Sequence, residues 1–289
     1  MDLSVLIVTY NSARDIERCL KSVQDHLDRD KIGYELCVVD NASADNTVEI
    51  IRRQFPTVKL ICESRNLGFA GGIQSGLAAT AAPFVLWLNP DAVIERGSIR
   101  TVLDRLRTEP RTGIAGLKIL NPDGSLQLSC RSFPTYATAV FSRYSLLTRI
   151  WPGNPFSRAY LLTNFNHEER REVDWVSGAC LLHRRELAQQ IGPPDDQFFM
   201  YCEDVDFCYR AKQAGWKVIY DPAFVVTHRI GGSSRPQAAA MILEHHRSMW
   251  RYYRKHYRKG LLMDLIVYTA IKLRAAAKIS HTFIKGVQK

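Results

Sequence analysis

Short apolar runs and helical patterns alternate along the first 90 residues, and this alternation restricts the possible folds more than any other feature of the chain. Apolar runs occupy residues 3–8, 36–39, 58–61 and 84–88, and apolar residues at helical spacing follow each of the first three. Parallel strands need long crossover connections, which helices of about 10–15 residues supply. We therefore expect an α/β fold built on a doubly wound, mostly parallel sheet.

Polar side chains follow three of these runs directly. Tyr10 and Asn11 follow the first run, Asp40 ends the second, and Asn89 and Asp91 follow the fourth. In a doubly wound sheet, ligands bind outside the carboxyl ends of the parallel strands. The sequence therefore predicts a ligand site at that edge of the sheet.

Beyond about residue 113 the alternation gives way to other patterns. Asn121-Pro122-Asp123-Gly124 lies between two apolar segments and is typical of a hairpin turn. Residues 131–170 are irregular and aromatic-rich, which we interpret as an insertion. Further strands are expected at 113–120, 125–129, 176–183, 217–220 and 224–228, and further helices at 203–214, 237–257 and 261–284.

The polar strand ends and a glycine-rich segment, residues 66–76, allow two interpretations. Glycines at a strand-to-helix turn let backbone N–H groups approach a phosphate. Asp91 is placed to bind a divalent cation on a diphosphate, and Asp40 to accept hydrogen bonds from a ribose or base. Taken singly, however, such glycines are more often plain turns, and an Asp after a strand is more often a helix cap.

Short motifs occupy these strand ends in a distinctive order. They are Val8-Thr9-Tyr10-Asn11-Ser12, Val38-Val39-Asp40-Asn41-Ala42-Ser43, Asn66-x-Gly68-Phe69-Ala70-x-Gly72, Leu88-Asn89-Pro90-Asp91, Val176-Ser177-Gly178-Ala179, Phe198-Phe199-Met200-Tyr201-x-Glu203-Asp204-x-Asp206, Gly215-Trp216 and Val226-x-His228. In this order and spacing they resemble family 2 glycosyltransferases, most of all the bacterial rhamnosyltransferase-like branch. The resemblance covers about residues 3–235.

The resemblance implies a GT-A fold, with a Rossmann-like nucleotide-sugar half at 1–110 and an acceptor half at 111–235. It also implies inverting, metal-dependent, non-processive transfer of a sugar from a nucleoside-diphosphate sugar. The expected acceptor is a glycan or a polyprenol-linked lipid of bacterial cell-surface polysaccharide synthesis. We expect rhamnose from dTDP-rhamnose, ahead of galactose, glucose or an N-acetylhexosamine from UDP.

The resemblance also assigns roles to individual residues at the donor site. Asp91 matches the metal-binding acid of the family's D-x-D motif, and His228 completes a site for Mn²⁺ or Mg²⁺, although a lone His at a strand end is more often simply a polar residue with a partner. Asn89 replaces the first acid of that motif, so ribose binding there is expected to be weaker or redistributed. The expected donor-binding residues are Thr9, Tyr10, Asn11, Asp40, Arg65, Asn66, Gly71 and Asn89.

Two neighbouring acids carry the expected catalysis. An inverting transfer needs a carboxylate that takes a proton from the acceptor hydroxyl. By resemblance Asp204 is this base, and Glu203 is the alternative. The alternative is that Glu203 and Asp204 are merely acids of a first helical turn, where their charge complements the helix dipole. Asp206 is expected to have a supporting role or to be a surface acid.

The net charge of +10 is confined to the end of the chain. Residues 245–289 hold eleven Lys and Arg and one acid, which leaves 28 bases and 28 acids in residues 1–244. A nucleic-acid partner is therefore not expected. The segment 236–289 is predicted to form basic amphipathic helices that hold the protein peripherally on the cytoplasmic face of the bacterial inner membrane. Packing on the catalytic domain and a homo-oligomer interface are the alternatives.

Other sequence features limit the compartment and the class of protein. The start of the chain lacks a basic region, so no secretory signal is expected. The longest apolar run near the end, residues 261–271, is shorter than the roughly 18–20 residues of a spanning helix. Seven cysteines without C-x-x-C spacing indicate reduced thiols rather than a disulfide scaffold or zinc site.

Two rival functions remain beside the transferase. A membrane-associated nucleotide-sugar binding protein with a degenerate catalytic site is the first, and Asn89 is its only support. A Rossmann oxidoreductase is the second, but its glycine-rich loop should follow the first strand, where this chain has Thr9-Tyr10-Asn11-Ser12.

Overall fold

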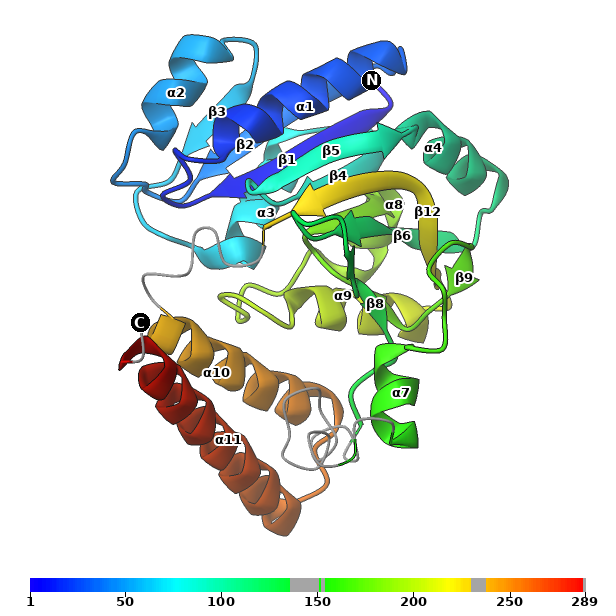
Figure 1. Ribbon diagram of the computed structural model, residues 1–289. Coiled ribbons are helices and arrows are strands. Elements are labelled where there is room, and N and C mark those ends of the chain that lie inside the picture. The colour runs from blue at the N-terminus through cyan, green and yellow to red at the C-terminus, as the bar shows by residue number, and fades with distance from the viewer. Residues whose placement is uncertain (136–150, 152–153, 230–237, 288–289) are drawn as a thin grey trace.

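The structure is a computed structural model that describes residues 1–135, 151, 154–229 and 238–287 (Figure 1). Its strands are β1 (Leu3–Thr9), β2 (Tyr34–Asp40), β3 (Lys59–Cys62), β4 (Phe84–Leu88), β5 (Ala92–Gly97), β6 (Thr112–Leu120), β7 (Leu126–Gln127), β8 (Cys130–Arg131), β9 (Arg171–Glu172), β10 (Trp175–Val176), β11 (Cys180–Arg184) and β12 (Lys217–His228). Its helices are α1 (Ile16–Arg29), α2 (Thr47–Gln54), α3 (Gly68–Ala79), α4 (Ile99–Thr108), α7 (Pro155–Leu161), α8 (Arg185–Ile191), α9 (Glu203–Gln213), α10 (Ala238–His256) and α11 (Leu261–Val287).

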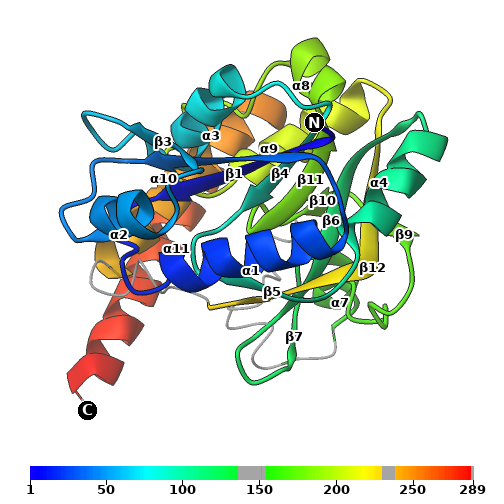
Figure 2. The ribbon, with the colours of Figure 1, turned by 90° about the horizontal axis from the view of Figure 1, so that it is seen from above.

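A ten-stranded mixed sheet forms the centre of the protein, with helices on both faces. Every residue of β1 is buried, because alternate side chains enter different cores. Leu3, Val5 and Ile7 pack with α1, α2 and α4, while Leu6 and Val8 pack with α3, α8 and α9. Figure 2 shows α1 and α3 on opposite sides of β1. The α/β fold expected from the alternating pattern is confirmed.

The strand order places the carboxyl ends of β1, β2, β3, β4, β6 and β12 at one edge of the sheet. The order is β3-β2-β1-β4-β11-β6-β12-β5. β11 is antiparallel to both β4 and β6, and β12 is parallel to β6. Two reversals cancel, so β12 runs in the same direction as β1, β2 and β4. His228, at the end of β12, therefore lies at the same edge as Thr9, Asp40 and Asn89.

Three strand predictions need correction. β5 was not predicted, although its residue Ala92 pairs with His228 and thereby places the preceding residue, Asp91, at the end of β12. The two strands expected at 217–220 and 224–228 are one strand, because the polar Asp221 between them is buried and bound by Arg105 and Arg170, at 2.7 and 2.8 Å.

The third correction concerns the strand expected at 176–183. It is divided into β10 and β11, and residues 177–179 between them form no strand. The hairpin around Asn121–Gly124 is present, with Ile119 opposite Gln127.

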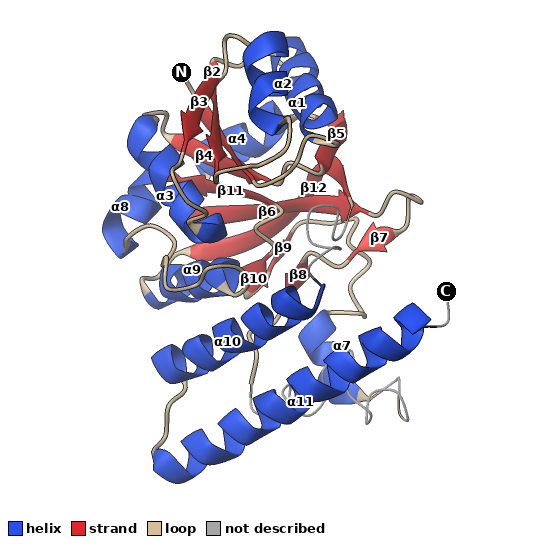
Figure 3. Cartoon of the chain, turned by 90° about the vertical axis from the view of Figure 1, so that its left-hand side faces the viewer, coloured by secondary structure: helices blue, strands red, loops and turns tan. Residues whose placement is uncertain are grey.

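α10 and α11 form a helical hairpin that packs beyond α9 (Figure 3). The Ser248 hydroxyl on α10 donates to the Met200 carbonyl at 2.8 Å. The buried Asp206 of α9 binds Arg210 at 2.7 Å and Lys255 at 2.8 Å, and its Oδ1 atom lies 2.7 Å from the His256 Nε2 atom. Asp206 is thus an internal anchor between α9 and α10, and the expectation of a surface acid was wrong.

Replacing Asp206 by Asn should destabilise the protein, because it leaves buried cationic partners without their carboxylate. Burial pushes the pKa of Asp206 up, but His256, Arg210 and Lys255 outweigh it and lower the pKa to about 2. We expect a loss of roughly 3 kcal/mol at pH 7, seen as a fall in Tm of roughly 6–10 °C.

The pH dependence of this destabilisation tests the role of Asp206 as an anchor. A carboxyl whose pKa is lowered by folding stabilises the protein above its unfolded value of about 3.9, and this contribution fades as the pH falls towards 2. The difference in Tm between wild type and variant should therefore narrow over that interval. The exposed Asp196→Asn is the control, and an equal effect of both substitutions would contradict the anchor role.

Candidate functional site

The loops after β1 and β2 are tied together by Asp40. This carboxylate is buried and accepts hydrogen bonds from the Thr9 hydroxyl at 3.0 Å, the Ser43 hydroxyl at 2.5 Å and the Ser43 N–H at 2.9 Å. Thr9 is fully buried, so its role in the site is to orient Asp40. Asn11 has a positive φ of 51° and its side chain accepts from the Ala44 N–H at 2.8 Å. Tyr10, partly exposed between them, lies beside this bonded pair of loops.

The loop after β3 joins the same edge through Asn41. Its amide donates to the Gly68 carbonyl at 2.9 Å, and its backbone N–H donates to the Thr9 carbonyl at 2.8 Å. Asn66 is partly exposed and accepts from the Gly68 N–H at 2.9 Å, while Arg65 is exposed at the rim. Asn41 was not among the expected site residues, although it follows Asp40 directly in the motif.

The glycines of α3 serve close packing. Gly68 has a positive φ of 76°, and the Phe199 carbonyl occupies the space that a Cβ would need. A Cβ at Gly72 would lie 2.5 Å from Val8, and one at Gly71 would lie 2.8 Å from Leu67. The first two N–H groups of α3 already have protein acceptors. The geometry therefore favours packing over the expected approach of these amides to a phosphate.

Asp91 and His228 meet at the end of β4 and β12. The pairing of Ala92 with His228 brings the Asp91 Oδ1 atom to 3.2 Å from the His228 Nε2 atom. The Asn89 amide nitrogen lies 3.1 Å from the same Nε2 atom, and the Gln127 Oε1 atom lies 2.8 Å from Nδ1. The two expected metal ligands are therefore neighbours, although they are 137 positions apart in the chain.

The residues at this point fit a hard divalent cation. If the Nδ1–H group of His228 donates to Gln127, Nε2 is the ring atom left to bind a metal. Nε2 and the Asp91 carboxylate oxygen are then two acceptors in contact, which a cation would hold together. Within the described residues no group of three His, Cys, Asp or Glu side chains is arranged to bind one metal, so a donor phosphate would have to supply further ligands.

A strained turn presents the two expected catalytic acids. Tyr201 and Cys202 both have positive φ, 68° and 67°, directly before α9. Such strain is concentrated at functional sites. Asp204 is partly exposed, and its carboxylate accepts from the Gly178 N–H at 2.9 Å and from the Val205 N–H at 2.8 Å.

The two acids differ in their electrostatic setting. Burial raises the pKa of Asp204, but the Gly178 and Val205 N–H groups and the charge of Arg131 oppose this rise. Glu203 is buried, and burial and the charge of Asp204 raise its pKa well above the ordinary value. Its Oε2 atom has no hydrogen-bond partner among the described residues. Asp204 is thus better suited to be the ionised base, and Glu203 to stay protonated.

Residues 177–179 connect the two clusters. The Gly178 N–H group binds Asp204, and the next residue, Ala179, accepts from the Asn89 N–H at 3.0 Å. The structure thereby brings together the strand-end residues of the first half and the acids of the second half. Gln127, Gly178 and Arg131 are additions to the expected set, and only Gly178 lay in a motif.

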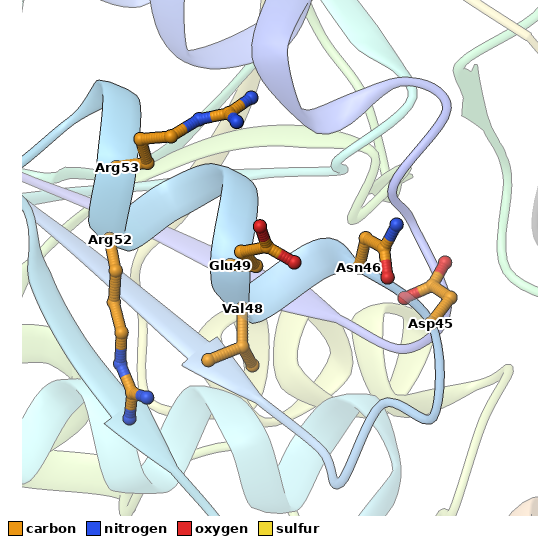
Figure 4. A pocket seen from close by; sticks show the side chains of 6 residues that line it. All are labelled: Asp45, Asn46, Val48, Glu49, Arg52 and Arg53. Atoms are coloured by element: carbon orange, nitrogen blue, oxygen red, sulfur yellow. The ribbon is translucent and has the colours of Figure 1, made fainter.

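One surface hollow lies away from these residues. It runs along α2 and is lined by Asp45, Asn46, Val48, Glu49, Arg52 and Arg53, as Figure 4 shows. Asp45 there accepts hydrogen bonds from Ala13 and Thr47, as a helix-capping residue does. The expected site residues are absent from its lining, whereas a second hollow includes Asp91 and Arg229.

Comparison with known proteins agrees with this arrangement. The model of the family described as glycosyl transferase family 2 matches residues 4–191. N-acetylglucosaminyl-diphospho-decaprenol L-rhamnosyltransferase of Mycobacterium tuberculosis is 32% identical over 259 residues, 86% of this chain and 82% of the relative. The rhamnosyltransferase WbbL of Escherichia coli K12 is 25% identical over 173 residues, 58% of this chain and 61% of that relative.

A solved structure supports the fold. The mannosyltransferase PcManGT of Pyrobaculum calidifontis, in complex with GDP-Man and Mn²⁺, superposes with a TM-score of 0.59 at 18% identity, covering 99% of this chain and 80% of that one. The expected GT-A fold is thereby confirmed. The chain is a glycosyltransferase that belongs to glycosyl transferase family 2, in its rhamnosyltransferase-like part.

Proposed function

We propose that this protein transfers rhamnose from dTDP-rhamnose, with inversion and with a divalent metal, to a sugar carried on a polyprenyl diphosphate. The observation that carries the proposal is the connection of Asp204 to the Asp91–His228 pair through residues 177–179. The relative from Mycobacterium tuberculosis, whose name specifies a decaprenyl-diphosphate acceptor and rhamnose, supports the choice of substrates.

Asp204 is the proposed base of a single displacement. Its carboxylate would take the proton of the acceptor hydroxyl as the oxygen attacks the anomeric carbon, opposite the leaving diphosphate. The N–H groups of Gly178 and Val205 hold the carboxylate in place. Glu203 lies beside it as a protonated group, because its pKa is raised by burial.

The donor side uses the strand ends. Asp91 and His228 would hold Mn²⁺ or Mg²⁺, which when bound neutralises charge on the departing diphosphate. Asp40, fixed by Thr9 and Ser43, is the proposed partner of the nucleoside. The Asn89 amide nitrogen lies 3.1 Å from His228 Nε2, the proposed metal-binding atom, so this amide would have to move away when the metal binds.

The outer face of α11 is proposed to lie on an anionic membrane. Leu262, Leu265, Ile266 and Leu273 are 75, 63, 53 and 67% exposed and recur at helical spacing. The neighbouring Arg258, Lys259 and Lys272 are exposed and basic, which favours anionic lipid headgroups. In the part of the chain that the structure describes, no helix is both long and apolar enough to cross a membrane. A peripheral position on the cytoplasmic leaflet follows as part of the proposal.

Asp204→Asn should abolish most transfer while donor binding remains. With Mn²⁺ or Mg²⁺, dTDP-rhamnose and a lipid-diphosphate-linked N-acetylglucosamine acceptor, we expect kcat to fall by roughly 10²–10⁴-fold. The Kd of dTDP, measured by calorimetry, should be unchanged. Unchanged turnover would refute the base assignment, and a wild type that binds dTDP but transfers no sugar from any donor would favour the binding-protein alternative.

The pH dependence of kcat/KM should report the environment of Asp204. Because burial raises the pKa of Asp204, the acidic limb should lie above the ordinary value of about 3.9. Arg131 lowers this pKa, so Arg131→Gln should move the limb to higher pH. The exposed Arg53→Gln is the control, and a limb that stays in place in Arg131→Gln would contradict the arrangement.

Leu265→Gln should weaken binding to vesicles that contain phosphatidylglycerol by roughly tenfold, since it removes a large apolar side chain from the proposed membrane face. Vesicle co-sedimentation of the full chain measures this. Leu243→Gln, on α10 and 41% exposed, is the matched control. Equal affinity of wild type and Leu265→Gln would reject this membrane face without affecting the transferase assignment.

A further inference from the structure

Positively charged and imidazole groups converge beside Asp204 from three separate elements. Arg131 lies on β8, His245 on α10, and Arg274 and Lys278 on α11. We name these four residues the cationic cluster. Of the four, only Arg131 has a role in the reaction described above, through its effect on the pKa of Asp204.

The register of the α10–α11 hairpin brings the cluster together. The Tyr253 hydroxyl donates to Asp264 at 3.1 Å, and the rings of Trp250 and Tyr268 lie 5.1 Å apart. These contacts fix an antiparallel pairing. Extending it by about two turns along each helix places His245 opposite the turn that carries Arg274.

The first half of α10 rests on the segment that leads to the catalytic acids. The rings of His245 and Tyr201 lie 4.9 Å apart, and Ser248 binds the Met200 carbonyl. Tyr201 is only three residues before Asp204. The cationic cluster therefore adjoins the proposed base.

Arg131 reaches the same place from the sheet. Strand β8 pairs with β10, which places Arg131 opposite Trp175, and its guanidinium lies 5.2 Å from that ring. Its charge acts on both Asp204 and His245. Its Nε atom is buried and has no hydrogen-bond acceptor among the residues described.

The positive charges of the cluster act on its own members. Burial, and then the charges of Lys278, Arg274 and Arg131 together with His246, lower the pKa of His245 to about 3. Burial and Arg274 also lower the pKa of Lys278. Arg274 and Lys278 are four residues apart on one helix, where like charges repel. Packing such groups together is favourable when an anion lies among them.

We propose that the cationic cluster binds the diphosphate of the isoprenyl-diphosphate-linked acceptor. This inference rests on the proposed function and adds the subsite that recognises the acceptor. Among the described residues of α11, Leu273 is the last large apolar side chain that is exposed, and Arg274 and Lys278 lie one and five positions beyond it. The apolar surface, the cationic cluster and the base Asp204 follow one another in the same order as the lipid, the diphosphate and the sugar of the acceptor.

Calorimetry with farnesyl diphosphate tests the subsite without requiring turnover. In EDTA, which excludes binding through a divalent metal, we expect the full wild-type chain to bind farnesyl diphosphate roughly tenfold or more tightly than farnesol. Arg274→Gln/Lys278→Gln should lose roughly that factor. The matched control, Arg251→Gln/Arg254→Gln, removes two exposed charges from the neighbouring helix α10 and should retain wild-type affinity.

Other sources of phosphate are separate arms of the experiment. Competition by dTDP would place the ligand in the donor site, and equal affinity for dihexanoyl phosphatidylglycerol would make the cluster a phospholipid site; either result overturns the proposal. An equal loss of affinity in both double variants would also overturn the proposal, because it would indicate diffuse electrostatic attraction rather than a specific site. If the enzyme transfers rhamnose but binds farnesyl diphosphate no more tightly than farnesol, only the proposal about the cluster is rejected. If it binds the diphosphate but transfers no sugar, the proposed function is rejected.

Discussion

The site depends on a break in one strand of the chain. If residues 175–184 were a single continuous strand, their N–H and C=O groups would all be engaged in the sheet. Instead, β10 pairs with β8 and β11 pairs with β4, and in the link between them the Gly178 N–H group donates to Asp204 while the Ala179 carbonyl accepts from Asn89. A Cβ at Gly178 would lie 3.4 Å from both the Asp204 Cβ and Phe69, which leaves little room for a larger residue. Two backbone groups thereby set the relation between the base and the proposed metal pair.

The second dependence is the link from α9 to the terminal hairpin. Asp206 is two residues from Asp204 and binds Lys255 and His256 of α10. A carboxylate without exposure that binds Arg210, Lys255 and His256 is costly to form and costly to break, so it fixes one relative placement of the two helices. Whatever surface α10 and α11 rest on is therefore held in a defined position relative to the base.

The sequence predicted the parallel part of the fold well because its signals are local. Apolar runs and the polar residues that end them directly indicated β1, β2, β4 and the edge where Asp40 and Asp91 lie. The same reasoning failed where distant residues compensate a local signal: Asp221 interrupts an apolar pattern, yet Arg105 and Arg170 keep it inside β12. The glycines after β3 left two interpretations open, a plain turn and a phosphate-binding turn, because their use in packing depends on the distant Val8 and Phe199. Gln127 and Arg131 had no local signal, since their importance comes only from the pairing of other strands.

The unequal distribution of charge has a structural meaning that composition alone does not show. The basic end of the chain divides into exposed groups such as Lys272, which face outward, and Arg274 and Lys278, which turn inward towards His245. Because one helix carries both sets next to the apolar positions that end at Leu273, it offers separate places for a lipid and for its charged headgroup. The final helices are thus better understood as part of the acceptor side of the enzyme than as a detachable anchor, since Asp206 and Ser248 bind them directly to the segment that carries the base.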